Sequence, residues 1–139
     1  MTISFRYKSV ERPDKTLVKT PSIPILLKGK EVFETIGLMD SGADISAMSK
    51  DVAELLGLDL RGKKEPAFGI GGKVDSVETK VRITIEKGHE QYTFLIPVKV
   101  ILGQYDFPVL LGRAGFFEKF IICFDEEKEK ISLKRNTNK

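Results

Sequence analysis

The sequence contains very little cysteine and histidine, with one residue of each among 139. The lone Cys123 cannot form a disulfide within the chain, which favours a reducing cytosol. No histidine partner is available to activate it as a nucleophile, so we expect Cys123 to be a small buried residue of a strand. His89 lies in an expected turn without a second histidine or a cysteine nearby. We therefore expect no metal site and no organic cofactor.

Long apolar runs and a concentration of one charge are also missing. No apolar run approaches the ~20 residues that cross a bilayer, and Met1–Arg6 lacks the hydrophobic centre of a secretory signal. We expect a cytoplasmic protein with no membrane partner. The 23 basic and 20 acidic residues are spread along the chain, whereas a nucleic-acid-binding β-barrel needs a basic groove with exposed aromatic side chains. No nucleic-acid partner is expected.

The length and composition fit one domain. Hydrophobic residues make up 41% of the chain and charged residues 31%, which is ordinary for a globular protein. A chain of this length can bury about two-thirds of its surface. We expect a strand and a loop over residues 1–22, a single domain over 23–133 and a basic flexible tail over 134–139.

Alternating apolar residues predict strands over most of the chain. Residues 23–27 and 31–38 are two extended runs separated by Lys28-Gly29-Lys30, which is typical of a β-hairpin. A second hairpin is predicted from the alternation in 77–85 and 92–102, and a third from residues 121–133. These strands predict an all-β fold.

One short helix is predicted over residues 49–57. Ser49 can cap its first turn, and Gly57 can end it. Val52, Leu55 and Leu56 are expected to share its buried face.

An acidic residue directly follows the second arm of the first predicted hairpin. Asp40 comes after the apolar residues Ile36–Met39 and is followed by Ser41 and Gly42. A carboxylate at the end of a buried strand is costly unless it is paired, hydrogen-bonded or protonated, and function is the usual reason to keep it there. Taken alone the triplet is weak evidence, because a turn aspartate that ends a strand has the same sequence.

Two further motifs accompany Asp40. Gly69-Ile70-Gly71-Gly72 is a glycine-rich turn that precedes a strand, so it is not a phosphate-binding loop, although a plain hairpin turn is an alternative. Leu110-Leu111-Gly112-Arg113 follows nearer the C-terminus. With the three motifs in this order, residues 23–125 resemble the retropepsin-like aspartic proteases. The resemblance implies a closed or partly open β-barrel with a catalytic loop at Asp40–Asp44 and a flap at the glycine-rich turn.

The resemblance also implies roles for individual residues. Asp40, Ser41 and Gly42 would be the catalytic residues, with the Ser41 hydroxyl joining two copies of the loop. Asp44 and Arg113 would form an internal ion pair. Contacts with the substrate are implied for Ala43, Asp44, Gly69, Ile70, Gly71, Gly72, Val109 and Leu110.

The chemistry of this family needs a second chain. Aspartic proteases use two carboxylates about 3 Å apart that share one proton, and one chain supplies a single such loop. An isologous twofold dimer would place Asp40 beside its symmetry mate. We therefore expect a homodimeric endopeptidase that cleaves polypeptides at acidic or mildly acidic pH, with a bell-shaped profile that belongs to the pair of carboxylates.

Two features depart from the family. Ala114 stands where a polar Asn or Asp usually follows the Gly-Arg step, and the hairpin at residues 121–133 is longer than the terminal strand of the retroviral enzymes. The sequence therefore does not identify the edge through which two copies would dimerise. The alternative function is an inactive dimer of the same fold that binds peptides or supports assembly.

Overall fold

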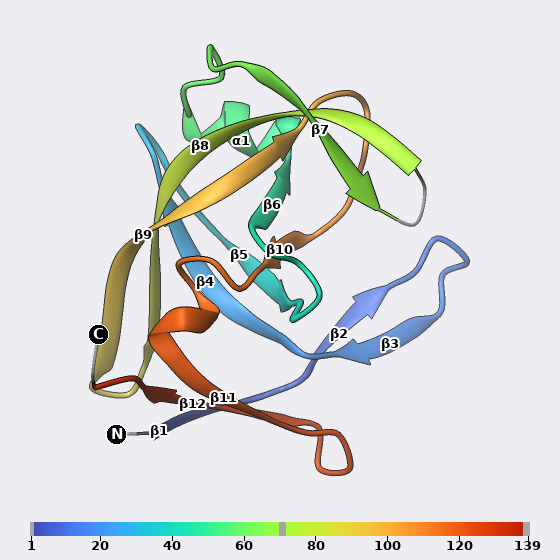
Figure 1. Ribbon diagram of the computed structural model, residues 1–139. Helices are drawn as coiled ribbons and strands as arrows, with labels where there is room; N and C mark the ends of the chain where they lie inside the picture. Colours follow the sequence, from blue (N-terminus) through green and yellow to red (C-terminus); the bar gives the residue numbers. More distant parts are fainter. Residues whose placement is uncertain (1, 70–71, 138–139) are drawn as a thin grey trace.

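The computed structural model describes residues 2–69 and 72–137. No helix in this part of the chain is long and apolar enough to cross a membrane. The elements are mostly strands (Figure 1): β1 (Thr2–Arg6), β2 (Lys8–Glu11), β3 (Leu17–Thr20), β4 (Ser22–Lys28), β5 (Val32–Met39), β6 (Ser46–Ser49), α1 (Lys50–Leu56), β7 (Lys64–Gly69), β8 (Gly72–Lys87), β9 (Glu90–Ile101), β10 (Val109–Leu111), the 3-10 helix η1 (Phe117–Lys119), β11 (Phe120–Asp125) and β12 (Lys130–Arg135).

A seven-stranded sheet forms the body of the molecule. Its strand order is β4-β5-β10-β6-β9-β8-β7, and an additional pairing of β8 with β4 closes six of the strands into a barrel. Most neighbouring strands are antiparallel, but β10 runs parallel to β5 and β6 runs parallel to β9. The predicted all-β barrel with one short helix is confirmed.

The hairpins predicted from local turns are also confirmed. Strands β4 and β5 pair from Ser22 opposite Leu38 to Lys28 opposite Val32. Strands β8 and β9, and strands β11 and β12, form the other two predicted hairpins. Each hairpin joins neighbouring segments of the sequence, so its turn and its alternation were sufficient to indicate it.

The predicted helix is present, but the prediction of its buried face was partly wrong. The Ser49 hydroxyl accepts a hydrogen bond from the N–H of Val52, and Gly57 ends the helix with a φ of +70°. The buried residues are Ala53 and Leu56, whereas Leu55 is 53% exposed. Adjacent residues point about 100° apart around a helix, and here the covered side of α1 carries Ala53 and Leu56 while Leu55 is left in solvent.

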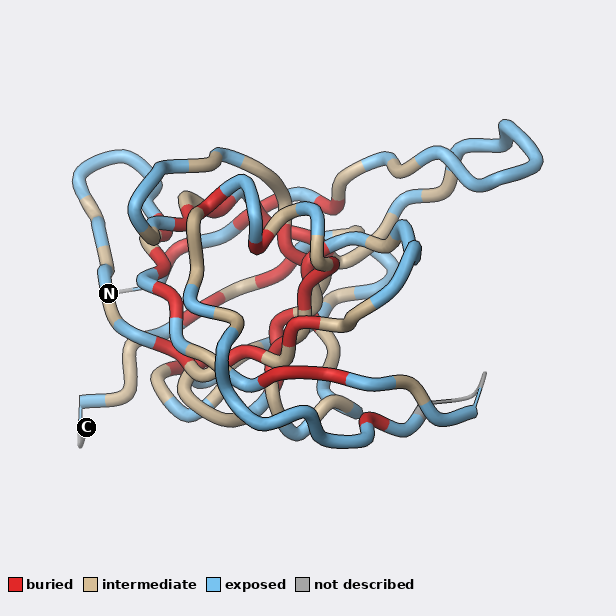
Figure 2. The backbone as a smooth tube through the Cα atoms, turned by 90° about the horizontal axis from the view of Figure 1, so that it is seen from above, coloured by how far each residue is buried: buried red, intermediate tan, exposed pale blue. Residues whose placement is uncertain are grey.

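The N-terminal segment contains three strands instead of the predicted strand and loop. Strand β1 pairs antiparallel with β12, which places it in a three-stranded sheet with β11. Its alternating residues Ile3 and Phe5, together with Tyr7 just after the strand, belong to the main core. Strands β2 and β3 form a separate hairpin, and Figure 2 shows it projecting from the body with mostly exposed residues.

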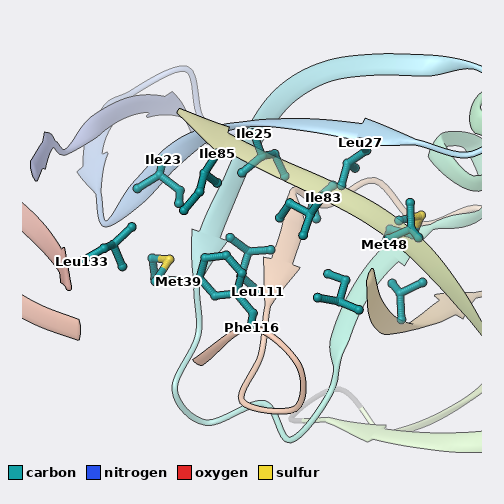
Figure 3. Packing of buried hydrophobic residues seen from close by; sticks show 14 of the residues in the cluster. Ile23, Ile25, Leu27, Met39, Met48, Ile83, Ile85, Leu111, Phe116 and Leu133 are labelled. Atoms are coloured by element: carbon teal, nitrogen blue, oxygen red, sulfur yellow. The ribbon is translucent and has the colours of Figure 1, made fainter. Parts of the chain in front are cut away.

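The core lies inside the barrel and under the terminal sheet. Figure 3 shows side chains from distant strands meeting there, including Ile25 of β4, Ile83 of β8 and Leu133 of β12, all of which are buried. Cys123 does not belong to this core: it is exposed, contrary to the sequence prediction. Its neighbour on the same face of β11, Ile121, is 60% exposed as well, because none of the residues that the structure describes covers this face.

Candidate active site

The backbone of Asp40 is held between two other segments of the chain. Strand β5 ends at Met39, whose side chain lies in the core near Phe116 (Figure 3). The N–H of Met39 donates to the carbonyl of Pro21 at 2.9 Å, and the N–H of Asp40 donates to the carbonyl of Leu111 at 3.0 Å. The position of Asp40 is therefore fixed by main-chain bonds.

The Asp40 carboxylate organises the turn that follows it. Its Oδ1 accepts a hydrogen bond from the N–H of Gly42 at 3.0 Å, and its carbonyl accepts one from the N–H of Ala43 at 3.1 Å. Asp40 is half-buried, while Ser41 and Gly42 are exposed. A Cβ atom at residue 42 would lie 3.3 Å from Asp40 Oδ1, so glycine leaves room for this contact. The acid is hydrogen-bonded and still reaches solvent.

Strand β10 and the residues after it lie directly beside this loop. Leu111 of β10 is the parallel partner of Met39, and the N–H of Gly112 donates to the Ser46 hydroxyl at 2.9 Å. A Cβ atom at residue 112 would meet the Ile45 carbonyl carbon at 2.6 Å, so only glycine allows this approach. The structure thus brings together two of the predicted motifs, Asp40–Asp44 and Leu110–Arg113.

Ser46 was missed by the sequence analysis. It is completely buried, and its hydroxyl satisfies the Gly112 N–H. No local pattern marks such a residue, because its partner comes from a distant part of the sequence. A serine between the apolar residues Ile45 and Met48 is the one available signal, since a buried hydroxyl needs a hydrogen-bond partner.

The predicted ion pair between Asp44 and Arg113 is not formed. Both residues are exposed, and the ion pairs of the described residues lie elsewhere, between Lys15 and Glu11 and between Arg61 and Asp59. Exposed charges gain little from pairing in water. The two segments are instead joined through their backbones: the N–H of Arg113 donates to the carbonyl of Ala43 at 2.9 Å, and the N–H of Ala114 donates to that of Asp44 at 2.8 Å. These bonds need no polar side chain at residue 114, so alanine is compatible with them.

The glycine-rich turn connects the long hairpin of β7 and β8, which we call the flap hairpin. Gly69 is paired with Gly72, whose φ of +107° favours glycine. Ile70 and Gly71, which were predicted to contact the substrate, lie outside the described residues. Phe68, one residue before Gly69, is 78% exposed.

The two residues predicted to contact the substrate from β10 differ in exposure. Val109 is 5% exposed and belongs to the core, so it offers little surface to a ligand. Leu110 is half-buried. Of the two, Leu110 alone has a side chain that is partly accessible.

Comparison with known proteins identifies the fold. No family model and no curated protein matches the sequence. Among solved structures, the chain is similar to a retropepsin-like aspartic protease from Rickettsia conorii, with 21% identity and a TM-score of 0.59 over 96% of this chain and 92% of that chain. It is also similar to EIAV protease complexed with the inhibitor HBY-793, with 26% identity and a TM-score of 0.42 over 68% of this chain and 83% of that chain, a likeness too distant to carry further detail. The first similarity shows that this chain has the retropepsin-like fold.

Proposed function

We propose that this retropepsin-like chain is an aspartic endopeptidase that works as a homodimer, with Asp40 of each copy forming the catalytic pair. The observation that carries the proposal is the position of Asp40. It is a hydrogen-bonded carboxylate that directly follows the buried Met39 at the end of β5, fixed through its backbone to Leu111 and still open to solvent.

The reaction follows from two carboxylates that share one proton. The ionised carboxylate takes a proton from a water molecule while the water oxygen attacks the carbonyl carbon of the peptide bond. The protonated carboxyl donates its proton to the carbonyl oxygen, which gives a neutral tetrahedral intermediate. Proton transfer to the amide nitrogen then accompanies cleavage of the C–N bond. The N–H of Gly42 takes one acceptor site of Asp40 Oδ1, which leaves the second lone pair of Oδ1 and both lone pairs of Oδ2 for the water and the shared proton.

The flap hairpin and the loop of Asp40 are proposed to hold an extended peptide between them. Main-chain groups of Gly42–Asp44 and of the glycine-rich turn Gly69–Gly72 would form strand-like hydrogen bonds with it. Leu110 would supply apolar contact for a substrate side chain, and Ser41 would join the two copies of the loop. Neither a metal nor a cofactor takes part in this scheme.

Cleavage of an unfolded protein at mildly acidic pH tests the activity. We expect the wild-type chain to cleave, and Asp40→Asn to lose at least about a thousandfold in rate, because an amide cannot act as the base. Asp51→Asn is the matched control, since it removes the same charge from an exposed position on α1. Equal cleavage by wild type and Asp40→Asn would end the enzyme proposal. An inactive wild-type dimer that binds peptides would instead support the alternative function. The cytoplasmic location stays a prediction.

A further inference from the structure

The hairpin of β2 and β3, residues 8–20, is a projecting arm. Its two strands pair with each other and form a two-stranded sheet of their own. In Figures 1 and 2 the arm and the flap hairpin extend from the same side of the molecule. An isolated two-stranded ribbon is marginally stable in water, so an arm of this kind gains order when another surface covers it.

The side chains of the arm contribute nothing to the core. Val10 and Val18 are paired across the arm and half-buried, and neither belongs to the core or packs against it. Leu17 on the opposite face is 71% exposed. Among the described residues, these apolar side chains thus lie outside the core cluster of the single chain.

The base of the arm is attached to the site. Thr20 at the end of β3 donates its hydroxyl hydrogen to the carbonyl of Lys8 at 3.2 Å, and its Oγ1 lies 2.8 Å from the hydroxyl of Ser22. Between these residues, the carbonyl of Pro21 accepts the N–H of Met39, the residue before Asp40. The arm therefore starts next to the loop that carries the catalytic acid.

We propose that the arm clasps the second copy of the chain and that dimerisation depends on it. The inference rests on the proposed function, which brings the second copy's Asp40 to about 3 Å from the first. A segment that starts beside Met39 and projects on the side of the flap hairpin then reaches the second copy. Contact with that copy covers Leu17 and the edges of β2 and β3, and the active site is incomplete until both copies are held.

Shortening the arm tests the proposal directly. Residues 10–18 are replaced by Asn-Gly, so that Ser9 and Lys19 are joined by a two-residue turn and the bonds at Thr20 and Pro21 are kept. We expect sedimentation to show a monomer at concentrations where the wild type is a dimer, and cleavage to be lost. Circular dichroism and thermal unfolding of the shortened chain should show an intact fold, because the removed side chains lie outside the core.

A point variant provides the second test. We expect Leu17→Ser to raise the dissociation constant of the dimer about tenfold or more, the effect of losing one buried apolar contact. Val32→Ser is the matched control: Val32 is 54% exposed and lies at the end of β5 opposite to Asp40. Amide hydrogen exchange at Val10 and Val18 should slow as the protein concentration rises, while exchange in β8 and β9 should not change.

The outcomes separate this inference from the proposed function. A shortened chain that dimerises as tightly as the wild type overturns the role of the arm, even if the protein is a protease. Protection of the arm by a peptide substrate, with no dependence on protein concentration, also overturns it. Asp40→Asn should remain dimeric while inactive, and a wild-type dimer without activity would fail the proposed function alone. A wild-type chain that stays monomeric at every concentration overturns both.

Discussion

The main-chain N–H of Asp40 donates a hydrogen bond to the carbonyl oxygen of Leu111 at 3.0 Å, across two strands that are far apart in the sequence. The next residue, Gly112, is then pressed against Ile45 and Ser46 on the far side of the same loop. The loop of Asp40 is thus fixed at its start by the carbonyl of Leu111 and at its end by the N–H of Gly112. The position of the Asp40 carboxylate should therefore depend on these contacts.

Gly112→Ala should destabilise the protein by about 1–3 kcal/mol, the usual cost of forcing extra atoms into a packed site. The new Cβ would lie 2.6 Å from the Ile45 carbonyl carbon and 2.8 Å from the Ser46 nitrogen, and backbone atoms cannot move aside as a flexible side chain can. Urea denaturation at one protein concentration measures the effect. Gly62→Ala is the control, since its Cβ would meet a valine methyl group at 3.3 Å. Equal losses in the two variants would contradict the prediction.

Ser46→Ala should cost about 1–3 kcal/mol of stability, because it leaves the buried N–H of Gly112 without an acceptor. The same unfolding experiment measures the loss, and activity should fall with it as the loop loosens. Ser132→Ala provides the comparison, since the Ser132 hydroxyl meets only the Ser4 hydroxyl in an exposed contact at 3.3 Å. A Ser46 variant as stable as the Ser132 variant would show that the Gly112 bond does not hold the loop.

Stability should fall between pH 10 and pH 12 in a way that depends on Tyr7. Burial, followed by the hydrogen bond from its hydroxyl to Glu126 at 3.0 Å, raises the pKa of Tyr7 from 10.0 to about 12. The folded state thus favours the neutral phenol, so this contribution is complete below the unfolded pKa near 10 and is lost as the pH rises through 12. Tyr7→Phe should remove this part of the decline when the free energy of unfolding is followed from pH 9 upward. Tyr105→Phe, at a residue that is 50% exposed, serves as the control, and identical slopes for wild type and Tyr7→Phe would refute the assignment.

Arg135→Ala should destabilise the protein by about 1 kcal/mol through loss of cation–π contacts. The Arg135 guanidinium lies 5.5 Å from the ring centroid of Tyr92 and 5.9 Å from those of Phe94 and Phe120, so it joins the end of β12 to the barrel. Thermal unfolding measures the change. The neighbouring Lys134 is exposed, and Lys134→Ala should have little effect. If the two substitutions lower the melting temperature equally, the aromatic contacts are not responsible.

The parts of the fold that follow from local sequence could be predicted. The hairpin of β4 and β5 places Asp40 at a strand end, and the helix cap at Ser49 and stop at Gly57 agree with the structure. Two pairings join distant segments, namely the parallel pairing of β5 with β10 and the pairing of β1 with β12. No turn in the sequence indicates them. Their existence depends on the packing of the whole chain.

The errors share a physical cause, which is that a sequence pattern does not say which face of an element is covered. Cys123 lies in β11 as the alternation predicted, but its face is left exposed by the part of the chain that the structure describes. Leu55 lies on the solvent side of α1. Asp44 and Arg113 lie close through their backbones but remain in water, where their charges have little reason to pair.

The closure of the barrel between β4 and β8 leaves β7 as an edge of the seven-stranded sheet. An open edge is a template on which strands of other molecules can add, and the usual end of that process is aggregation. Pro66 lies within β7, opposite Asp75. Proline has no N–H to offer to an added strand, and the adjacent Lys64 and Glu65 are exposed charges that oppose a flat apolar contact. The edge is thereby protected against uncontrolled growth of the sheet from one molecule to the next.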